Sequence, residues 1–194
     1  MTNCPQDILQ SNDSSQCGAI VTWSLPTATD NCVTPSVTNS DNSGDFFGVG
    51  NHTVTFTFSD TSGNSTDCVF DITVTDDESP VITFCPQDIV STNDAGDCGA
   101  IATWNMPTAT DNCVTPSVTN SHSSGDFFAV GTTTVTFTFS DTSGNSSDCV
   151  FNITVTDDEN PVITGCPQDI EVNNTFGTCT RNVSWTEPTA TDNC

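Results

Sequence analysis

Apolar and polar residues alternate along several short stretches of the chain. Residues 52–60 place Val54, Phe56 and Phe58 on one face and mainly threonine on the other, and no stretch keeps a helical period. Such two-residue alternation, with Gly, Asn, Ser and Asp between the stretches, is typical of half-buried antiparallel strands. In the first 80 residues it predicts strands at residues 7–10, 18–25, 36–39, 52–60 and 67–75, with a short segment at 46–47. The predicted fold is an all-β sandwich.

The pattern returns with a fixed period of 81 residues. Cys-Pro occurs at Cys4, Cys85 and Cys166, and 85 − 4 = 166 − 85 = 81. Residues 26–40 recur unchanged at 107–121. A period of this kind marks an array of similar modules. We expect a window on a longer array, with repeat 1 at residues 1–78, repeat 2 at 79–159, and a partial repeat 3 at 160–194 that holds only its first two strands.

Charge limits the partners of the chain. Acidic residues outnumber basic ones by 25 to 1, which gives a formal net charge of −24. We therefore expect no nucleic-acid partner, because phosphate binding needs a basic face, and no docking on anionic lipid. No apolar run is long enough to predict membrane insertion in this window. Twelve Phe and three Trp argue against disorder.

Cysteines indicate the compartment. Each full repeat has four, no Cys-x-x-Cys spacing is present, and the whole chain has two histidines. This pattern favours disulfides over zinc sites. Disulfides persist outside the cytosol, so an extracellular or cell-surface location is expected. Four cysteines allow three pairings, and the count alone leaves all three open.

Each repeat resembles a hyalin repeat, or HYR module. The matching features are Cys-Pro at the first strand, Cys17-Gly-Ala-Ile, Trp23, PTATDN at residues 26–31, Phe46-Phe47 before Gly50, and DTSGN at residues 60–64 followed by Cys68-Val-Phe. They cover essentially the whole chain. The resemblance implies tandem immunoglobulin-like antiparallel β-sandwiches, related to fibronectin type III, in an end-to-end array with a role in extracellular adhesion. The near-absence of basic residues departs from the family pattern.

The resemblance also implies a disulfide pairing. In an immunoglobulin-like sandwich the first and last strands run parallel and adjacent, which joins Cys4 to Cys68. The other two cysteines of each repeat then pair with one another. The expected bonds are Cys4–Cys68, Cys85–Cys149, Cys17–Cys32, Cys98–Cys113 and Cys179–Cys194, with Cys166 left over in this window.

Acidic residues are densest just before each Cys-Pro. In the implied topology these linkers approach two loops of the next repeat. Carboxylate and amide oxygens are ligands of Ca²⁺, which takes six to eight of them. The expected calcium ligands are Asp76, Asp77, Glu78, Asp111, Asn112 and Asp141 at the first joint, and Asp157, Asp158, Glu159 and Asp192 at the second. The alternative is a solvated acidic linker whose carboxylates only cap turns. This alternative stays open because the sequence has no EF-hand spacing that would indicate a calcium loop.

These patterns predict a structural function. We expect an extracellular filament or surface stalk of disulfide-stapled, calcium-rigidified repeats, whose partners are neighbouring repeats and other copies of the chain in a fibre. The alternative is a ligand-binding cell-adhesion module of a large surface adhesin. The loops are copied between repeats, which favours structure over recognition. No enzyme activity is expected, because His52 and His122 occupy non-equivalent positions and no base is placed beside a Ser or Thr.

Overall fold

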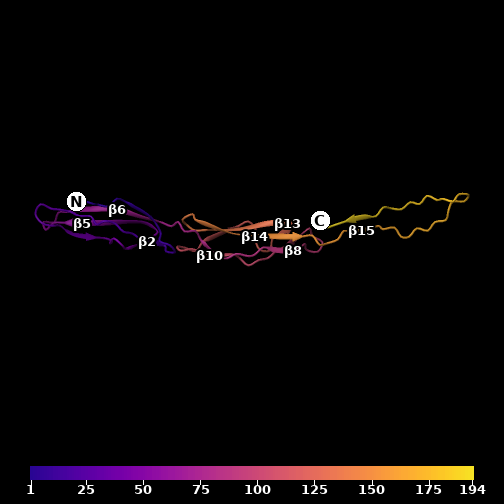
Figure 1. Cartoon of the computed structure of the whole chain (residues 1–194), viewed down its shortest axis with the longest axis horizontal. Coiled ribbons are helices and arrows are strands. Elements are labelled where there is room, and N and C mark those ends of the chain that lie inside the picture. The colour runs from indigo at the N-terminus through magenta and orange to yellow at the C-terminus, as the bar shows by residue number, and fades with distance from the viewer. The chain divides into compact units, whose positions relative to one another are not determined.

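The computed structural model describes all 194 residues. Its secondary structure consists of sixteen β-strands and contains no helix. No helix is therefore present that could cross a membrane. Figure 1 colours the chain from indigo at the N-terminus to yellow at the C-terminus. The contacts divide it into two compact units: unit 1 is Met1–Cys85, Pro107–Thr119 and Phe137–Cys149, and unit 2 is Pro86–Met106, Asn120–Thr136 and Val150–Cys194.

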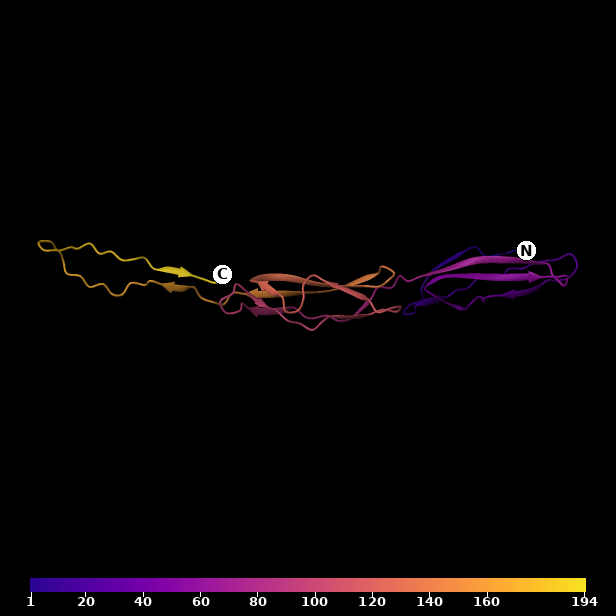
Figure 2. The same cartoon turned by 180° about the vertical axis from the view of Figure 1, so that it is seen from behind.

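The first sandwich lies entirely in unit 1. Its strands are β1 (Ile8–Ser11), β2 (Gly18–Ile20), β3 (Ser36–Asn39), β4 (Phe46–Gly48), β5 (Gly50–Ser59) and β6 (Ser65–Thr75). One sheet has the order β1-β6-β5-β3, and β2 pairs with β4 in the other. Strand β1 runs parallel to β6, whereas β5 runs antiparallel to β3 and β6. Strands β5 and β6 lie side by side in Figures 1 and 2. The predicted all-β, immunoglobulin-like class is confirmed.

The core is made by the alternating apolar positions. Val54, Phe56 and Phe58 of β5 are buried, as are the apolar residues of β6 that face them. Trp23 is half-buried, and its ring lies 5.4 Å from that of Phe70, centroid to centroid. Full burial of one such side chain stabilises the fold by roughly 1.5–3 kcal/mol. The two-residue period therefore reports which face of each strand points inward.

One predicted strand is shorter than expected. The alternation predicts a strand at residues 18–25, but β2 ends at Ile20. Beyond it, Ser43 takes over part of the pairing: its hydroxyl accepts a bond from Trp23 N at 2.8 Å and donates one to Trp23 O at 2.9 Å. A side chain thus replaces ladder hydrogen bonds, which the apolar pattern cannot report.

The second repeat has counterparts of these six strands and two further strands. They are β7 (Val81–Phe84), β8 (Ile89–Thr92), β9 (Gly99–Ile101), β10 (Thr108–Thr110), β11 (Ser117–Asn120), β12 (Phe127–Ala129), β13 (Gly131–Ser140) and β14 (Ser146–Thr156). The larger sheet has the order β11-β13-β14-β8, with β8 parallel to β14, and β9 pairs with β12. Strands β7 and β10 form an additional antiparallel pair in unit 1.

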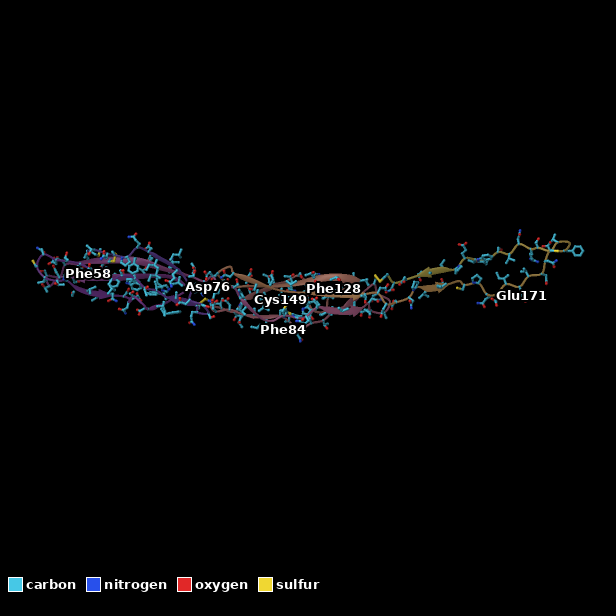
Figure 3. All side chains as sticks on the ribbon, viewed as in Figure 1. Phe58, Asp76, Phe84, Phe128, Cys149 and Glu171 are labelled. Atoms are coloured by element: carbon cyan, nitrogen blue, oxygen red, sulfur yellow. A yellow bond between two sulfur atoms is a disulfide. The ribbon has the colours of Figure 1, made fainter.

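Residues 160–194 differ from the two complete repeats. Their strands are β15 (Val162–Thr164) and β16 (Thr189–Thr191), which pair with one another. The expected first two strands of a sandwich are not formed there, because strands β1 and β2 pair with β6 and β4, which have no counterpart in this segment. Figure 3 labels Glu171 on this segment, and its side chain is exposed, unlike Phe58 and Phe128 of the sandwiches.

Candidate metal site at a disulfide-bridged joint

Four disulfide bonds are present. Two are Cys4–Cys68 and Cys85–Cys149, each spanning 64 residues within a repeat. They join the segment before the first strand to the last strand of the same sandwich, where β1 runs parallel to β6. This is the pairing that the family resemblance implied for these cysteines.

The expected Cys17–Cys32, Cys98–Cys113 and Cys179–Cys194 bonds are wrong in this structure. The other two bonds are instead Cys17–Cys113 and Cys98–Cys194, each spanning 96 residues between successive repeats. Cys32, Cys166 and Cys179 are free and exposed.

The strand register explains why Cys17 cannot reach Cys32. Gly18 pairs with Gly48, next to the start of β5, whereas Ser36 pairs with Ser59 at its end. Ten residues of strand span about 30 Å at ~3.3 Å each, and a disulfide needs Cα atoms within about 7 Å. The cysteines before Gly18 and Ser36 therefore lie at opposite ends of the sandwich.

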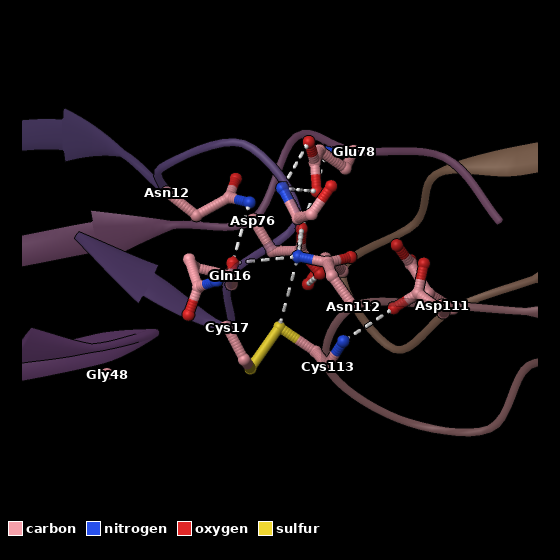
Figure 4. The surroundings of a disulfide bond; sticks show 12 residues. Asn12, Gln16, Cys17, Gly48, Asp76, Glu78, Asp111, Asn112 and Cys113 are labelled. Atoms are coloured by element: carbon pink, nitrogen blue, oxygen red, sulfur yellow. Dashed lines mark hydrogen bonds between the residues drawn. A yellow bond between two sulfur atoms is a disulfide. The ribbon is translucent and has the colours of Figure 1, made fainter. Parts of the chain in front are cut away.

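The Cys17–Cys113 bond brings a loop of repeat 2 against the acidic linker of repeat 1, within unit 1 (Figure 4). We call this contact the first joint, and its central residue is Asp76, which is only 8 % exposed. The Asn112 amide donates hydrogen bonds to Asp76 Oδ1 at 3.3 Å and to the Gln16 carbonyl at 3.0 Å. The carboxylate of the linker is thus enclosed by the next repeat.

A second loop of repeat 2 completes this enclosure. Ser143 Oγ donates to Asp76 Oδ2 at 3.4 Å, and the Asn145 amide donates to the Asp76 carbonyl at 3.1 Å. Both residues belong to the turn between β13 and β14, which lies in unit 1. The linker acid is therefore held by side chains from two separate loops.

Potential ligand atoms lie close together at this joint, and two of its buried oxygens have no hydrogen-bond partner. One oxygen each of Asp76 and Asp111 and the sulfur of Cys113 lie within 4.8 Å of one another. Asp111 Oδ1 and Asn112 Oδ1 are buried without a hydrogen-bond partner, and each such group costs about 1–3 kcal/mol. A bound cation would remove that cost. The joint therefore has the features of an oxygen-ligand cation site.

The type of cation follows from the ligand atoms that the joint offers. The Cys113 sulfur is in a disulfide and offers no thiolate, which zinc would require of a cysteine. What remains is one carboxylate oxygen each of Asp76 and Asp111, together with the unpartnered amide oxygen of Asn112 in the same loop as Asp111. These are hard oxygen ligands of the kind that calcium takes. A cavity of about 390 Å³ beside them, lined in part by Glu78, Thr110 and Asp111, gives room for water ligands. The residues present fit calcium.

The other expected ligands of this joint form hydrogen bonds elsewhere or are exposed to solvent. Both carboxylate oxygens of Glu78 accept the Ser15 backbone N–H at 2.9 Å. Asp77 is exposed, and its backbone N–H donates to Asn12 Oδ1 at 3.2 Å. Asp141 accepts hydrogen bonds from the backbone and the side chain of Asn145, both at 2.8 Å. Of the six expected ligands, the structure brings together Asp76, Asp111 and Asn112.

The Asp141 carboxylate is held in its charged form by the loop around it. Burial alone would raise its pKa, but the hydrogen bonds from Asn145, Gly144 and Ser143 together lower the pKa below 3.8. Asp60, at the same position of repeat 1, has a lowered pKa chiefly because of the Asn64 side chain. These acids stabilise their own turns.

Sequence reasoning missed residues that support the first joint. Asn12 and Ser15 of the loop between β1 and β2 contact the linker, and the Gln16 carbonyl of the same loop accepts a hydrogen bond from Asn112. Ser143 and Asn145 cover the linker from the second loop of repeat 2. The recurrence of Asn12 as Asn93 and Asn174, at steps of 81, was a usable signal.

The second joint, in unit 2, repeats only part of this arrangement. Glu159 accepts the Gly96 N–H at 3.0 Å, and the Asn193 amide donates to the Asp97 carbonyl at 2.8 Å. The expected ligands Asp157, Asp158 and Asp192 are exposed. No cluster of three potential ligand groups forms here.

Comparison with known proteins shows the family. The profile of the HYR domain matches residues 1–74 and 75–155. A hyalin of Strongylocentrotus purpuratus is 36 % identical over 98 % of this chain, and one of Lytechinus variegatus is 38 % identical over 90 %. The chain spans 16 % and 34 % of the lengths of these relatives. Among solved structures, extracellular cadherin domains 1–5 of protocadherin gamma B2 align at 14 % identity and a TM-score of 0.40, covering 84 % of this chain and 40 % of that one. The chain belongs to the HYR domain family.

Proposed function

We propose that this chain is a segment of an extracellular structural array, a filament or surface stalk, whose joints are fixed by disulfides and calcium. Its repeats are bounded at residues 1–78, 79–159 and 160–194, and its partners are neighbouring repeats and other copies of the chain. Disulfide bonds between repeats support an extracellular location, because such bonds persist outside the cytosol.

One observation carries the proposal: the buried Asp76 carboxylate lies beside Asp111 at a disulfide-bridged joint where buried oxygens of Asp111 and Asn112 have no hydrogen-bond partner. Two like charges about 4 Å apart repel by roughly 4 kcal/mol at an effective dielectric near 20. A divalent ion between the two carboxylates would convert this repulsion into coordination. Calcium would therefore hold the linker of one repeat against the loop of the next.

The expected affinity is modest. Three protein side chains supply fewer than the six to eight oxygens that calcium takes, so water must complete the shell. Extracellular modules of this kind bind calcium with dissociation constants of about 10⁻⁴–10⁻³ M. Because the ligands come from two repeats, binding stabilises the joint more than either sandwich.

Calorimetric titration of the metal-free chain with calcium tests this function. The double variant Asp76→Asn/Asp111→Asn should lose binding at the first joint and the accompanying rise in melting temperature. Asp41→Asn is the control for charge: it removes one negative charge, half of the change in the double variant, at a position where repeat 2 has His122. Unchanged melting with calcium or chelator, and equal titrations for both variants, would show that the acids serve only solubility.

A further inference from the structure

The four disulfide bonds connect into two covalent paths that bypass most of the chain. In rail 1, the Cys4–Cys68 bond leads along residues 68–85 to the Cys85–Cys149 bond. In rail 2, the Cys17–Cys113 bond leads back along residues 113–98 to the Cys98–Cys194 bond. Each rail thus crosses a repeat through one short segment and one disulfide.

The two rails have nearly equal lengths. Per 81-residue repeat, rail 1 uses 85 − 68 = 17 residue steps and rail 2 uses 113 − 98 = 15. At ~3.3–3.6 Å per extended residue, these segments reach about 60 Å and about 50 Å. The disulfides add Cα–Cα distances of 5.6 Å in rail 1 and 4.6 or 4.9 Å in rail 2. Tension along the array would load both rails together.

The rails contain little slack. Residues 68–85 include most of β6 and all of β7, and residues 98–113 include β9 and β10. Strands already rise by about 3.3 Å per residue, close to the limit of an extended chain. Pulling on the strand parts of these segments therefore yields little length, and their other residues can extend each rail no further than the limits given above. The Cys4–Cys68 bond bypasses the residues between these two cysteines, so most of them carry no tension. The exceptions are the residues that belong to rail 2.

We propose that the rails make the array a length-limited tether, in which tension is carried by covalent paths and unfolding of a sandwich cannot lengthen the chain. This inference rests on the proposed structural function, but it does not need calcium. Without the rails, an unfolded 81-residue repeat would extend to roughly 280 Å, about five times the limit that either rail sets. A stalk built in this way would keep its reach under load even when its domains melt.

The free cysteines fit the same scheme. Cys32 occupies the position of Cys113, Cys166 that of Cys85, and Cys179 that of Cys98, each at a step of 81. In an array that continues with this period, each would extend a rail into a neighbouring repeat. The two rails would then run without interruption, and one broken disulfide would leave the other rail intact.

Single-molecule pulling of the full chain by its two ends tests the tether. The free thiols are first alkylated, and chelator is present so that calcium plays no part. The shortest covalent path between the ends of the oxidised chain runs for 16 residue steps from Met1 to Cys17 and crosses the disulfide to Cys113. It then runs back for 15 steps to Cys98 and crosses the second disulfide to Cys194, the last residue. Its limit is about 115 Å, against about 660 Å for the chain after reduction by dithiothreitol. An oxidised limit near 185 Å is what bonds within repeats would give, and it would overturn the proposal.

Two sets of serine substitutions separate the rails. Replacing the rail 1 cysteines (Cys4, Cys68, Cys85 and Cys149) should leave the limit near 115 Å, because rail 2 is the shorter path between the ends. Replacing the rail 2 cysteines (Cys17, Cys98, Cys113 and Cys194) should roughly double it, to about 230 Å. Bonds confined to single repeats would instead give about 510 Å for the first variant.

Peptide mapping of the unreduced wild type guards against variants that fail to fold. A peptide pair linked through Cys17 and Cys113 must be found, and its absence would contradict rail 2 whatever the variants do. Loss of calcium binding leaves the length limit standing, whereas an extensible oxidised chain leaves the calcium site standing. The two proposals therefore fail separately.

Discussion

The two acidic linkers share a sequence but not an environment. Each has an Asp-Asp-Glu triplet, and each lies in a compact unit with a disulfide between successive repeats. In both, the glutamate accepts a backbone N–H from a loop of its own repeat, which is the β1–β2 loop for Glu78 and the equivalent β8–β9 loop for Glu159. Yet Asp76 is 8 % exposed, whereas Asp157 is exposed.

The difference comes from a second loop. Ser143 and Asn145 cover Asp76 at the first joint, and residues 160–194 contain no counterpart of their turn. The contacts of the glutamate are made within one repeat, so both joints have them. Burial of the first aspartate needs two loops of the following repeat. The candidate calcium site is therefore composite, and a single repeat cannot form it.

The largest expected contrast concerns the disulfides of the joints. Cys17→Ser/Cys113→Ser opens a loop of 96 residues between two complete sandwiches, and the chain-entropy model assigns such a bond roughly 4–5 kcal/mol. Cys98→Ser/Cys194→Ser should cost less, because the segment that it releases adds almost no buried core. Calorimetric unfolding of both variants measures this. Equal losses would mean that residues 160–194 are as firmly packed as the sandwiches.

The second-largest expected contrast between the joints is in their calcium affinity. Asp76→Asn removes a buried carboxylate that we propose as a calcium ligand, and it should weaken binding at least about tenfold, or ~1.4 kcal/mol. Asp157→Asn makes the same chemical change at an exposed position and should alter binding much less. Titration calorimetry at equal ionic strength compares them. Equal weakening by both substitutions would show that calcium binds to the linkers as a diffuse charge effect.

The covering loop can be tested through equivalent asparagines. Asn145→Ala removes bonds to Asp141 and to the Asp76 carbonyl, and leaving a buried acceptor unpaired costs about 1–3 kcal/mol. Asn64→Ala removes only bonds to Asp60, in an exposed turn, and should cost under about 1 kcal/mol. Chemical denaturation of the two variants provides the comparison. A larger loss for Asn64→Ala would contradict the role of Asn145 at the joint.

The sequence predicts the sandwich core well, because the two-residue period of Val54, Phe56 and Phe58 is a local property that burial directly reflects. It does not predict the partner of Cys17. Cys32 and Cys113 occupy equivalent positions of successive repeats, 81 residues apart. A periodic sequence therefore cannot distinguish a bond from Cys17 within its own repeat from a bond to the next repeat. Only the direction of the strands, which carries Cys32 to the far end, separates the two.

The proposed calcium ligands could also be predicted only in part from the sequence. Clustered acids correctly indicate the linker as the place where carboxylates meet the loops of the next repeat. They do not show that Asp76 turns inward while Glu78 binds the Ser15 N–H. That choice depends on backbone direction after β6, which alternation of apolar residues does not encode. The amide donors were missed because Asn and Ser are abundant throughout the chain.

The smallest expected effect is a pH dependence of the two equivalent turns. The Asn64 side chain lowers the pKa of Asp60, and hydrogen bonds from Asn145, Gly144 and Ser143 outweigh burial and lower the pKa of Asp141. A lowered folded pKa means that each charge stabilises its turn above about pH 3.8, and that this contribution is lost as pH falls through the folded value. Carbon-detected NMR titration should find both carboxylates titrating below 3.8. Asn64→Ala and Asn145→Ala should each raise the pKa of their own aspartate only, and a shift at both sites would show that the turns are not independent.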